Sequence, residues 1–193
     1  MRSRRILRPR RTTVFVGCEG KSEVAYIRLV QVLCDKASLA VHITPHDLGP
    51  QGEPLSRVRA AIRKIKHHEM SREKFAACFI LLDDDQTVKE PQRALQAKAL
   101  AQKNDISLIW QSPCHEAMLL RHFETHTNDR PGSSAIADRQ LKAVWPEYLK
   151  PMERRDLERK IGFDAVLRVA KVEQGLFVFL TRLGLVTPDP EQV

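Results

Sequence analysis

The sequence lacks the features that mark membrane, secreted and zinc-binding proteins. No apolar stretch approaches the roughly 18 residues of a membrane span, and the basic N-terminus lacks the apolar segment of a secretory signal. The four cysteines include no pair at Cys-x-x-Cys spacing, and Cys18, Cys34 and Cys78 lie within apolar runs. We therefore expect small core cysteines in a reducing compartment, no structural zinc, no membrane partner and a cytoplasmic location.

Aromatic residues, repeats and nucleotide-binding loops are also scarce. Aromatic residues make up 6% of the chain and form no cluster on which the bases of a single strand would stack. The triplet Glu19–Lys21 lacks the Gly-x-x-x-x-Gly-Lys spacing of a Walker A loop. No repeat is visible, and 193 residues with 42% hydrophobic and 29% charged residues are typical of one soluble globular domain.

Positive charge is abundant and unevenly distributed. Lys and Arg number 32 against 24 Asp and Glu, a difference of 8, and the pI is about 9.6. The first eleven residues contain no acid and carry six arginines, namely Arg2, Arg4, Arg5, Arg8, Arg10 and Arg11. We expect residues 1–11 to form a disordered arm that is attracted to polyanions such as nucleic acid. A merely solubilising extension is an equal alternative.

The stretch Phe79–Asp85 runs from four apolar residues directly into three carboxylates. Such a run is typical of a buried strand of a parallel sheet, although periodicity alone does not distinguish it from a buried helix segment. In a strand, Asp83 and Asp85 point the same way and Asp84 points the other way. Acids held close together repel each other unless a cation or a shared proton neutralises them, and Mg²⁺ takes carboxylate ligands. A solvated strand end is the alternative interpretation.

A second apolar run, residues 14–18, ends in the same manner at Glu19, which Gly20 and Lys21 follow. Ligands of parallel α/β sheets bind outside the carboxyl ends of the strands. We therefore expect Glu19, Asp83 and Asp85 to converge at one sheet edge and to hold a divalent cation there.

The order of the elements predicts an α/β fold. Expected strands alternate with helices along the chain, the strands at 12–18, 39–48, 74–82 and 105–110 and the helices at 22–35, from 53 and at 87–103. This alternation is typical of a parallel, doubly wound sheet with helices on both faces. A short helix near 141–149 and a largely helical segment at 161–185 follow, and the latter is expected to pack over the sheet.

The domain organisation follows from these elements. We expect a single domain at 12–185, made of a sheet core at 12–124 and a helical extension at 125–185, and a frayed tail at 186–193. Within it, the helix beginning at Glu53 carries a basic face of Arg57, Arg59, Arg63, Lys64 and Lys66. Such a face is usually just solvated, but it also suits a nucleic-acid backbone.

Glu116 follows the fourth expected strand, within the segment Ser112–Glu116 that begins another helix. Pro113 suits the first turn of that helix, and the helix dipole favours a carboxylate near its N-terminus. Glu116 is therefore either a capping acid or a further metal ligand or orienting group. His115 is either a structural residue or a general acid/base or phosphate contact.

These motifs resemble a known family. Glu19-Gly20 after a first strand and Asp83-x-Asp85 after a later one resemble the Toprim signature of topoisomerases, primases and OLD-type nucleases. The segments VGCEGKSEVAYI, CFILLDDDQT and SPCHEAMLLRHFE are more similar still to RloB-like proteins, small Toprim-related proteins linked to bacterial restriction and abortive-infection loci. The resemblance runs from about Thr12 to Glu124. RloB-like proteins commonly carry an aromatic residue where His115 stands here.

The resemblance implies a Toprim-like domain that acts as a Mg²⁺- or Mn²⁺-dependent nuclease on RNA or DNA in anti-phage defence. Asp83 and Asp85 would hold the cation, and Glu19 would be a general base or acid or a ligand of a second metal. Lys21 would offset charge on the phosphate. So would Lys150, because Tyr148-x-Lys150 is similar to a tyrosine-to-lysine segment of the family.

Other function classes remain open. The domain is alternatively a non-catalytic nucleic-acid- or nucleotide-binding regulatory module that signals to a partner protein encoded nearby, such as an ATPase. In a third interpretation, nucleic acid is bound chiefly by basic residues of the arm and its neighbourhood, namely Arg4, Arg5, Arg8, Arg10, Arg11 and Lys21. The oligomeric state stays open. Side chains at 19, 83 and 85 that face apart, or Glu19 paired with an arginine in the interior, would contradict the nuclease hypothesis.

Overall fold

A computed structural model of the protein describes residues 11–49, 52–85, 87 and 90–187. Within them, four parallel strands form one sheet in the order β2-β1-β3-β4. The strands are β1 (Thr12–Cys18), β2 (Val41–Asp47), β3 (Ala77–Asp83) and β4 (Ile106–Gln111). The α/β fold with a parallel sheet is therefore confirmed. Because β3 pairs directly with β1, the two acid-tipped strands are neighbours.

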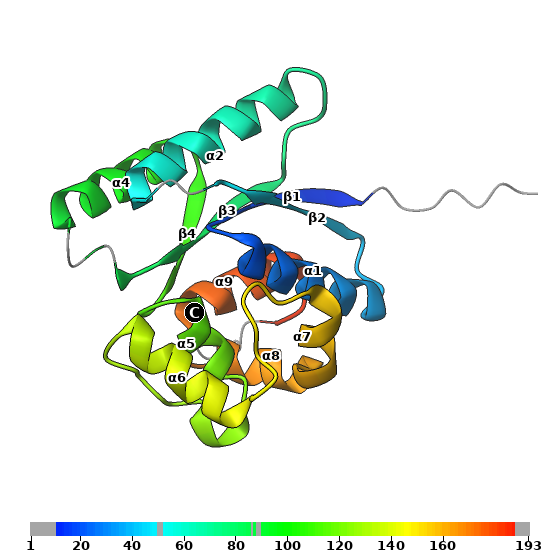
Figure 1. The fold of residues 1–193 in the computed structure, drawn as a ribbon. Helices are drawn as coiled ribbons and strands as arrows, with labels where there is room; N and C mark the ends of the chain where they lie inside the picture. Colours follow the sequence, from blue (N-terminus) through cyan, green and yellow to red (C-terminus); the bar gives the residue numbers. More distant parts are fainter. Residues whose placement is uncertain (1–10, 50–51, 86, 88–89, 188–193) are drawn as a thin grey trace, which may run out of the picture.

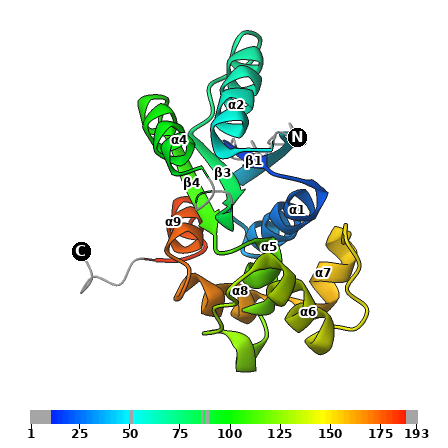
Figure 2. The ribbon, with the colours of Figure 1, turned by 60° about the vertical axis from the view of Figure 1, so that its left-hand side comes forward.

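Helices cover both faces of the sheet, as expected (Figures 1 and 2). On one face lie α2 (Pro54–Glu69) and α4 (Pro91–Lys103), and on the other α1 (Lys21–Lys36) and α9 (Gln174–Leu183). The remaining helices gather below α1 and α9 in Figure 1, and they are α5 (His115–Leu120), η1 (Glu124–His126), α6 (Ser134–Val144), α7 (Arg154–Lys160) and α8 (Phe163–Ala170). None of the described helices combines the length and apolar character that crossing a membrane requires.

Side-chain alternation along the central strands builds a separate core on each face. In β3, Phe79 and Leu81 belong to the core under α1 and α9, whereas Ile80 and Leu82 belong to the core under α2 and α4. In β1, Val14, Val16 and Cys18 join the α1 core, whereas Phe15 joins the α2 core. This alternation decides which side each acid at the strand ends occupies.

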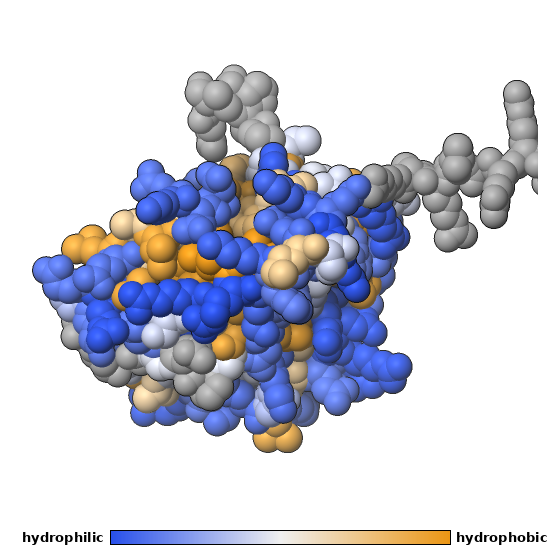
Figure 3. Space-filling view, turned by 90° about the horizontal axis from the view of Figure 1, so that it is seen from above, coloured by the Kyte–Doolittle hydropathy of each residue, from blue (hydrophilic) through white to orange (hydrophobic). Residues whose placement is uncertain are grey.

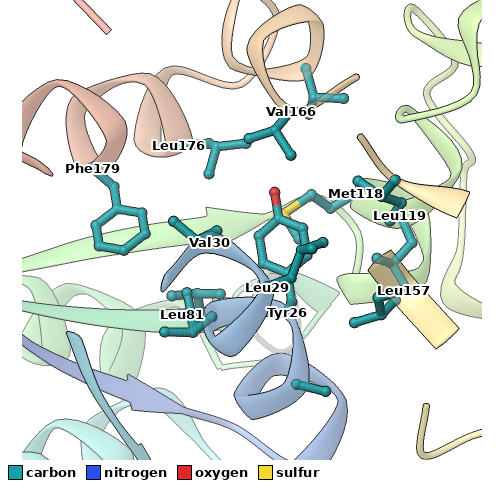
Figure 4. Close-up of a cluster of buried hydrophobic side chains, with 14 of the residues drawn as sticks. Tyr26, Leu29, Val30, Leu81, Met118, Leu119, Leu157, Val166, Leu176 and Phe179 are labelled. Atoms are coloured by element: carbon teal, nitrogen blue, oxygen red, sulfur yellow. The ribbon is translucent and has the colours of Figure 1, made fainter. Parts of the chain in front are cut away.

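The C-terminal helices share the α1 core. Figure 4 shows Leu157, Val166, Leu176 and Phe179 around Tyr26, Leu29 and Leu81. The rings of Phe79 and Phe179 lie 5.0 Å apart, and a Cβ added at Gly175 would be only 3.2 Å from the Cα of Ile109. The segment 161–185 therefore packs on the sheet, as expected, but as two helices rather than one.

Some local details differ from the sequence pattern. The helix expected at 22–35 begins at Lys21, Gly20 precedes its first turn, and Ser22 is buried inside it. Leu95 is 60% exposed because α4 approaches the sheet through its small residues Ala94, Ala97 and Ala101. Figure 3 looks onto this α2–α4 side, where apolar surface lies between charged side chains. Residues 1–10 of the arm expected at 1–11, and residues 188–193 of the tail expected at 186–193, lie outside the described residues.

Candidate functional site

Five carboxylates gather at the carboxyl edge of the sheet. Asp83 ends β3, Glu19 follows β1 directly, and Glu23 lies in the first turn of α1. Asp85 lies two residues after Asp83, and Glu116 lies in the first turn of α5, after β4. The charges of the other four all raise the pKa of Asp83, so these residues form one electrostatic cluster.

Asp83 is the acid at the centre of this cluster. It continues the parity of Phe79 and Leu81, and so its side chain lies on the α1 face. Its Oδ1 accepts a hydrogen bond from the backbone N–H of His115 at 2.9 Å. Burial, followed by the charges of the neighbouring acids, raises the pKa of Asp83 to about 9. In the described part of the chain, no lysine or arginine forms an ion pair with it.

Glu23 is a site residue that our reading of the sequence missed. It is 4% exposed, and no ion pair to it exists among the described residues. The available signal is its spacing: Glu19 and Glu23 are four residues apart across a strand-to-helix turn, and Glu23 precedes an apolar helix face. An acid in the first turn usually interacts with the helix dipole. Its burial beside Asp83 distinguishes it from a surface acid.

Glu19 lies on the opposite face of the sheet from Asp83. It continues the parity of Phe15, whose side chain points towards α2. Its Oε1 lies 2.6 Å from Nη2 of Arg57, and its Oε2 accepts the backbone N–H of Asp83 at 3.1 Å. Burial raises the pKa of Glu19 above its ordinary value, while the Asp83 N–H and Arg57 oppose the rise. Both carboxylate oxygens of Glu19 are thus engaged within the protein.

Two expectations are corrected by this ion pair. Arg57 was placed on a solvated basic face, but it is only 6% exposed. Glu19 was expected to share a cation with Asp83 and Asp85, and instead it pairs with an arginine in the interior. This contradicts the nuclease hypothesis in its predicted form, with Glu19, Asp83 and Asp85 as the metal ligands, so a nuclease at this edge needs a different ligand set. Among the described residues, no three His, Cys, Asp or Glu side chains form a ready metal-binding group.

Asp85 is less closely tied to the site than expected. β3 ends at Asp83, so the strand alternation that would align Asp85 with it does not extend that far. Oδ2 of Asp85 accepts a hydrogen bond from the Ser134 hydroxyl at 3.1 Å, at the start of α6. Asp84 turns away and accepts the Thr87 hydroxyl at 2.6 Å.

Lys150 reaches the acid edge from the helical extension. Its Nζ donates to Oε1 of Glu116 at 2.6 Å, and the Tyr148 hydroxyl donates to the same oxygen at 3.2 Å. Burial alone would raise the pKa of Glu116, but the hydrogen bond and charge of Lys150 lower it to about 2. Burial would lower the pKa of Lys150, and its bond to Glu116 outweighs this and raises it. Glu116 therefore has its own counter-charge.

His115 is fully buried, so its ring does not reach a substrate. Its Nδ1 lies 2.8 Å from Nε2 of Gln111, and its ring stands edge-on to Tyr26. Burial lowers the pKa of His115. A phosphate contact or proton transfer through this ring, weighed from the sequence, is wrong, and what His115 gives the site is its backbone N–H to Asp83. Nor does Pro113 lie in the first helical turn, since α5 begins at His115.

The basic residues expected to bind nucleic acid are only partly described. Lys21 is the first residue of α1 and is exposed. Arg11 forms an ion pair with Asp35 at 3.1 Å. The other arm residues of that set lie outside the described residues, and they are Arg4, Arg5, Arg8 and Arg10.

The donor chemistry of the edge fits a hard divalent cation. Asp83 and Glu23 are carboxylates without a cationic partner in the described structure, and Asp83 is strongly disfavoured as an anion by its surroundings. Mg²⁺ binds through one or two carboxylates and completes its shell with water and phosphate oxygens. An open site of this kind does not require a closed group of three protein ligands.

Comparison with known proteins extends the likeness beyond the motif segments. The family model described as RloB-like protein matches residues 14–174. That range includes all five carboxylates and Lys150, and it continues through α6, α7 and α8. No curated protein and no solved structure matches the chain. Since the matched range covers most of the sequence, the chain belongs to the RloB-like protein family.

Proposed function

We propose that the chain is a metal-dependent nuclease with a Toprim-like sheet edge, and that Asp83 and Glu23 hold its Mg²⁺ or Mn²⁺ ion. One observation carries the proposal: two acids, one of them forced towards its protonated form, lie together at the carboxyl edge without a cationic partner in the described chain. A bound divalent cation would neutralise them, polarise a phosphate and stabilise the charge that develops during displacement. RNA and DNA both present the required phosphodiester.

The other residues of the edge act on Asp83 or on the phosphate. Glu19 accepts the Asp83 N–H and is anchored by Arg57, so it positions Asp83 rather than binding metal or moving a proton. The side chain of Lys150 is 58% exposed, so its ammonium is accessible to the negative charge of a phosphate. Lys21 is exposed at the start of the helix that carries Glu23. Asp85, two residues beyond Asp83, would add a ligand through water.

The test is cleavage of defined substrates. Full-length protein is mixed with tRNA, single-stranded RNA or plasmid DNA in Mg²⁺ or Mn²⁺, with EDTA as the metal-free control. We expect metal-dependent cleavage of at least one substrate and a loss of about a hundredfold or more in Asp83→Ala. Asp84→Ala is the matched control and should cleave as wild type does. No cleavage by wild type, or equal cleavage by Asp83→Ala, would reject the nuclease.

A regulatory module without turnover is the second candidate, and the paired acids favour it. Glu19 and Glu116 are already neutralised by Arg57 and Lys150, which leaves fewer free ligands than most nuclease sites offer. In this function the edge binds a nucleic acid or nucleotide and signals to a partner protein of a defence or restriction-linked system. Nucleic-acid affinity that survives alanine at Asp83 and Asp85, without cleavage, would support it.

A further inference from the structure

A basic cavity lies beside the acid edge, between α1 and α7. Its volume is about 720 Å³, large enough for part of a ligand to enter. Charged side chains from three elements line it: Lys21 and Arg28 of α1, Arg154 and Arg155 of α7, and the acids Asp47 and Glu153.

Three of the four cations in this cavity have no ion-pair partner among the described residues. Lys21, Arg28 and Arg155 are exposed, and none of them forms an ion pair within the described ranges. Arg154 is paired with Glu158 of its own helix, and Asp47 accepts the backbone N–H of Gly49 at 2.7 Å. The lining thus holds four cations against the two acids Asp47 and Glu153, and its net positive charge in one concave surface suits an anion with repeated charges, whereas a convex charged face is usually just solvated.

The cavity lies at the same edge of the sheet as the acids, and residues of the same chain segments line both. Asp47 lines it and ends β2, where it is paired in register with Cys18, the residue before Glu19, and Lys21 lines it from the first turn of α1. Pro151 and Met152 also line it, and they directly follow Lys150, whose ammonium holds Glu116. If one phosphate of a polynucleotide lies at Asp83, the neighbouring phosphates of the same strand would therefore lie beside these cations.

We propose that this cavity binds the sugar-phosphate backbone of a single nucleic-acid strand, next to the phosphodiester at the acid edge. This inference rests on the proposed function, because it assigns the substrate of that site to polynucleotides rather than mononucleotides. The repeated negative charge of a polynucleotide matches cations spread over two helices. A single strand is narrow enough to enter a cavity of this size. A duplex is too wide to enter it and could contact only its rim.

The experiment compares two matched charge removals in the full-length chain. The cavity variant is Arg28→Gln with Arg155→Gln, and the control is Arg72→Gln with Lys103→Gln, two exposed residues that precede β3 and β4 at the amino edge of the sheet. Binding of a short fluorescent single strand, as RNA and as DNA, is measured by anisotropy in Ca²⁺ over a range of salt. The N-terminal arm is present in every sample, so its contribution cancels.

The expected effect follows from counterion release. Each phosphate contact with a single strand contributes about 0.7 to the slope of log K against log salt. Because the cavity variant lacks two such contacts, the slope of its log K against log salt should be smaller by about 1.4. Its affinity for the single strand at about 0.1 M salt should be about 25-fold weaker than that of wild type. The control should bind as wild type does, and unchanged thermal unfolding of both variants would exclude a folding defect.

The outcomes separate this inference from the nuclease itself. Cleavage by wild type together with unchanged binding by the cavity variant would overturn the cavity and leave the nuclease standing. No cleavage, but selective loss of strand binding in the cavity variant, would support the cavity and reject the nuclease. Equal losses in both variants, or tighter binding of a duplex than of a single strand, would overturn the proposed strand path.

Discussion

The acids at the sheet edge divide into two kinds that differ only in their surroundings. Glu19 and Glu116 each have an arginine or lysine nitrogen 2.6 Å from a carboxylate oxygen. Asp83, half-buried, and Glu23, buried, lie at the same edge and have no such partner among the described residues. An acid with its own counter-charge holds the fold together, whereas an acid without one is available to an external cation. The site is thus divided into a supporting part and an open part.

The division has a simple origin in strand alternation. Glu19 continues the face of Phe15 and meets the helix that carries Arg57, whereas Asp83 continues the face of Leu81 and meets α1. Two acids at the ends of adjacent strands therefore need not share a ligand. Their contact is instead through the backbone N–H of Asp83, which Glu19 accepts.

Removing an unpaired acid should give the largest effect. Glu23→Gln keeps the size of the side chain but removes a ligand charge, so we expect metal-dependent cleavage to fall about a thousandfold, or about 4 kcal/mol. Thermal unfolding in EDTA should occur at a higher temperature, because a buried charge without a partner has been removed. Glu124→Gln, at an exposed position, should change neither measurement. Normal cleavage by Glu23→Gln would remove Glu23 from the site.

Removing the counter-charge of a paired acid should instead lower the stability of the fold. Arg57→Met leaves Glu19 half-buried without its cation, and we expect a loss of about 3 kcal/mol in the free energy of unfolding. Arg59→Met, an exposed neighbour on the same helix, should stay within about 0.5 kcal/mol of wild type. Adding Glu19→Gln to Arg57→Met should recover much of the loss. Urea unfolding measures wild type, the single variants Arg57→Met and Glu19→Gln, the double variant and the Arg59→Met control. Strictly additive losses would show that the two residues do not support each other.

The architecture of the sheet could be predicted from the sequence, because the apolar pattern of each strand and helix matches its place in the fold. Apolar runs such as Phe79–Leu82 identify buried strands, and the helices between them require parallel pairing. The edge that carries Glu19 and Asp83 follows from that topology. Element boundaries moved by a few residues, for example to Val41–Asp47 for the second strand.

The sequence was not sufficient for which side chains meet. Apolar runs do not state which face of a strand will pack on which helix, so the separation of Glu19 from Asp83 could not be read from them. The partnership of Arg57 with Glu19 is a contact between distant positions, and periodicity alone places Arg57 on the polar face of its helix. Glu23 was hidden because an acid in a first helical turn has an ordinary explanation.

Acid should weaken the paired half of the site. The pKa of Glu116 is about 2 in the fold, although burial opposes this, against an ordinary 4.5. Its stabilisation is therefore complete above pH 4.5 and is lost as the pH falls towards 2. We expect Glu116→Gln to be less stable than wild type by about 2 kcal/mol at neutral pH, a figure reduced for the exposure of Lys150, and the difference to vanish near pH 2. Urea unfolding across this range measures it, with exposed Glu147→Gln as the control.

The smallest effect should come from the exposed partner of that pair. Lys150→Met removes an ammonium that is 58% exposed, and solvent screening limits the expected loss to about 1 kcal/mol. Lys142→Met breaks a pair with Asp138 in which both side chains are exposed, so its cost should be smaller still. Without Lys150, burial should raise the pKa of Glu116 from about 2 towards or above its ordinary 4.5. The loss of stability between pH 4.5 and pH 2 that Glu116 causes, its acid limb, should therefore shrink or disappear. An unchanged acid limb would show that the Tyr148 hydroxyl alone maintains Glu116 as an anion, and the paired half of the site would then depend on hydrogen bonding rather than on charge.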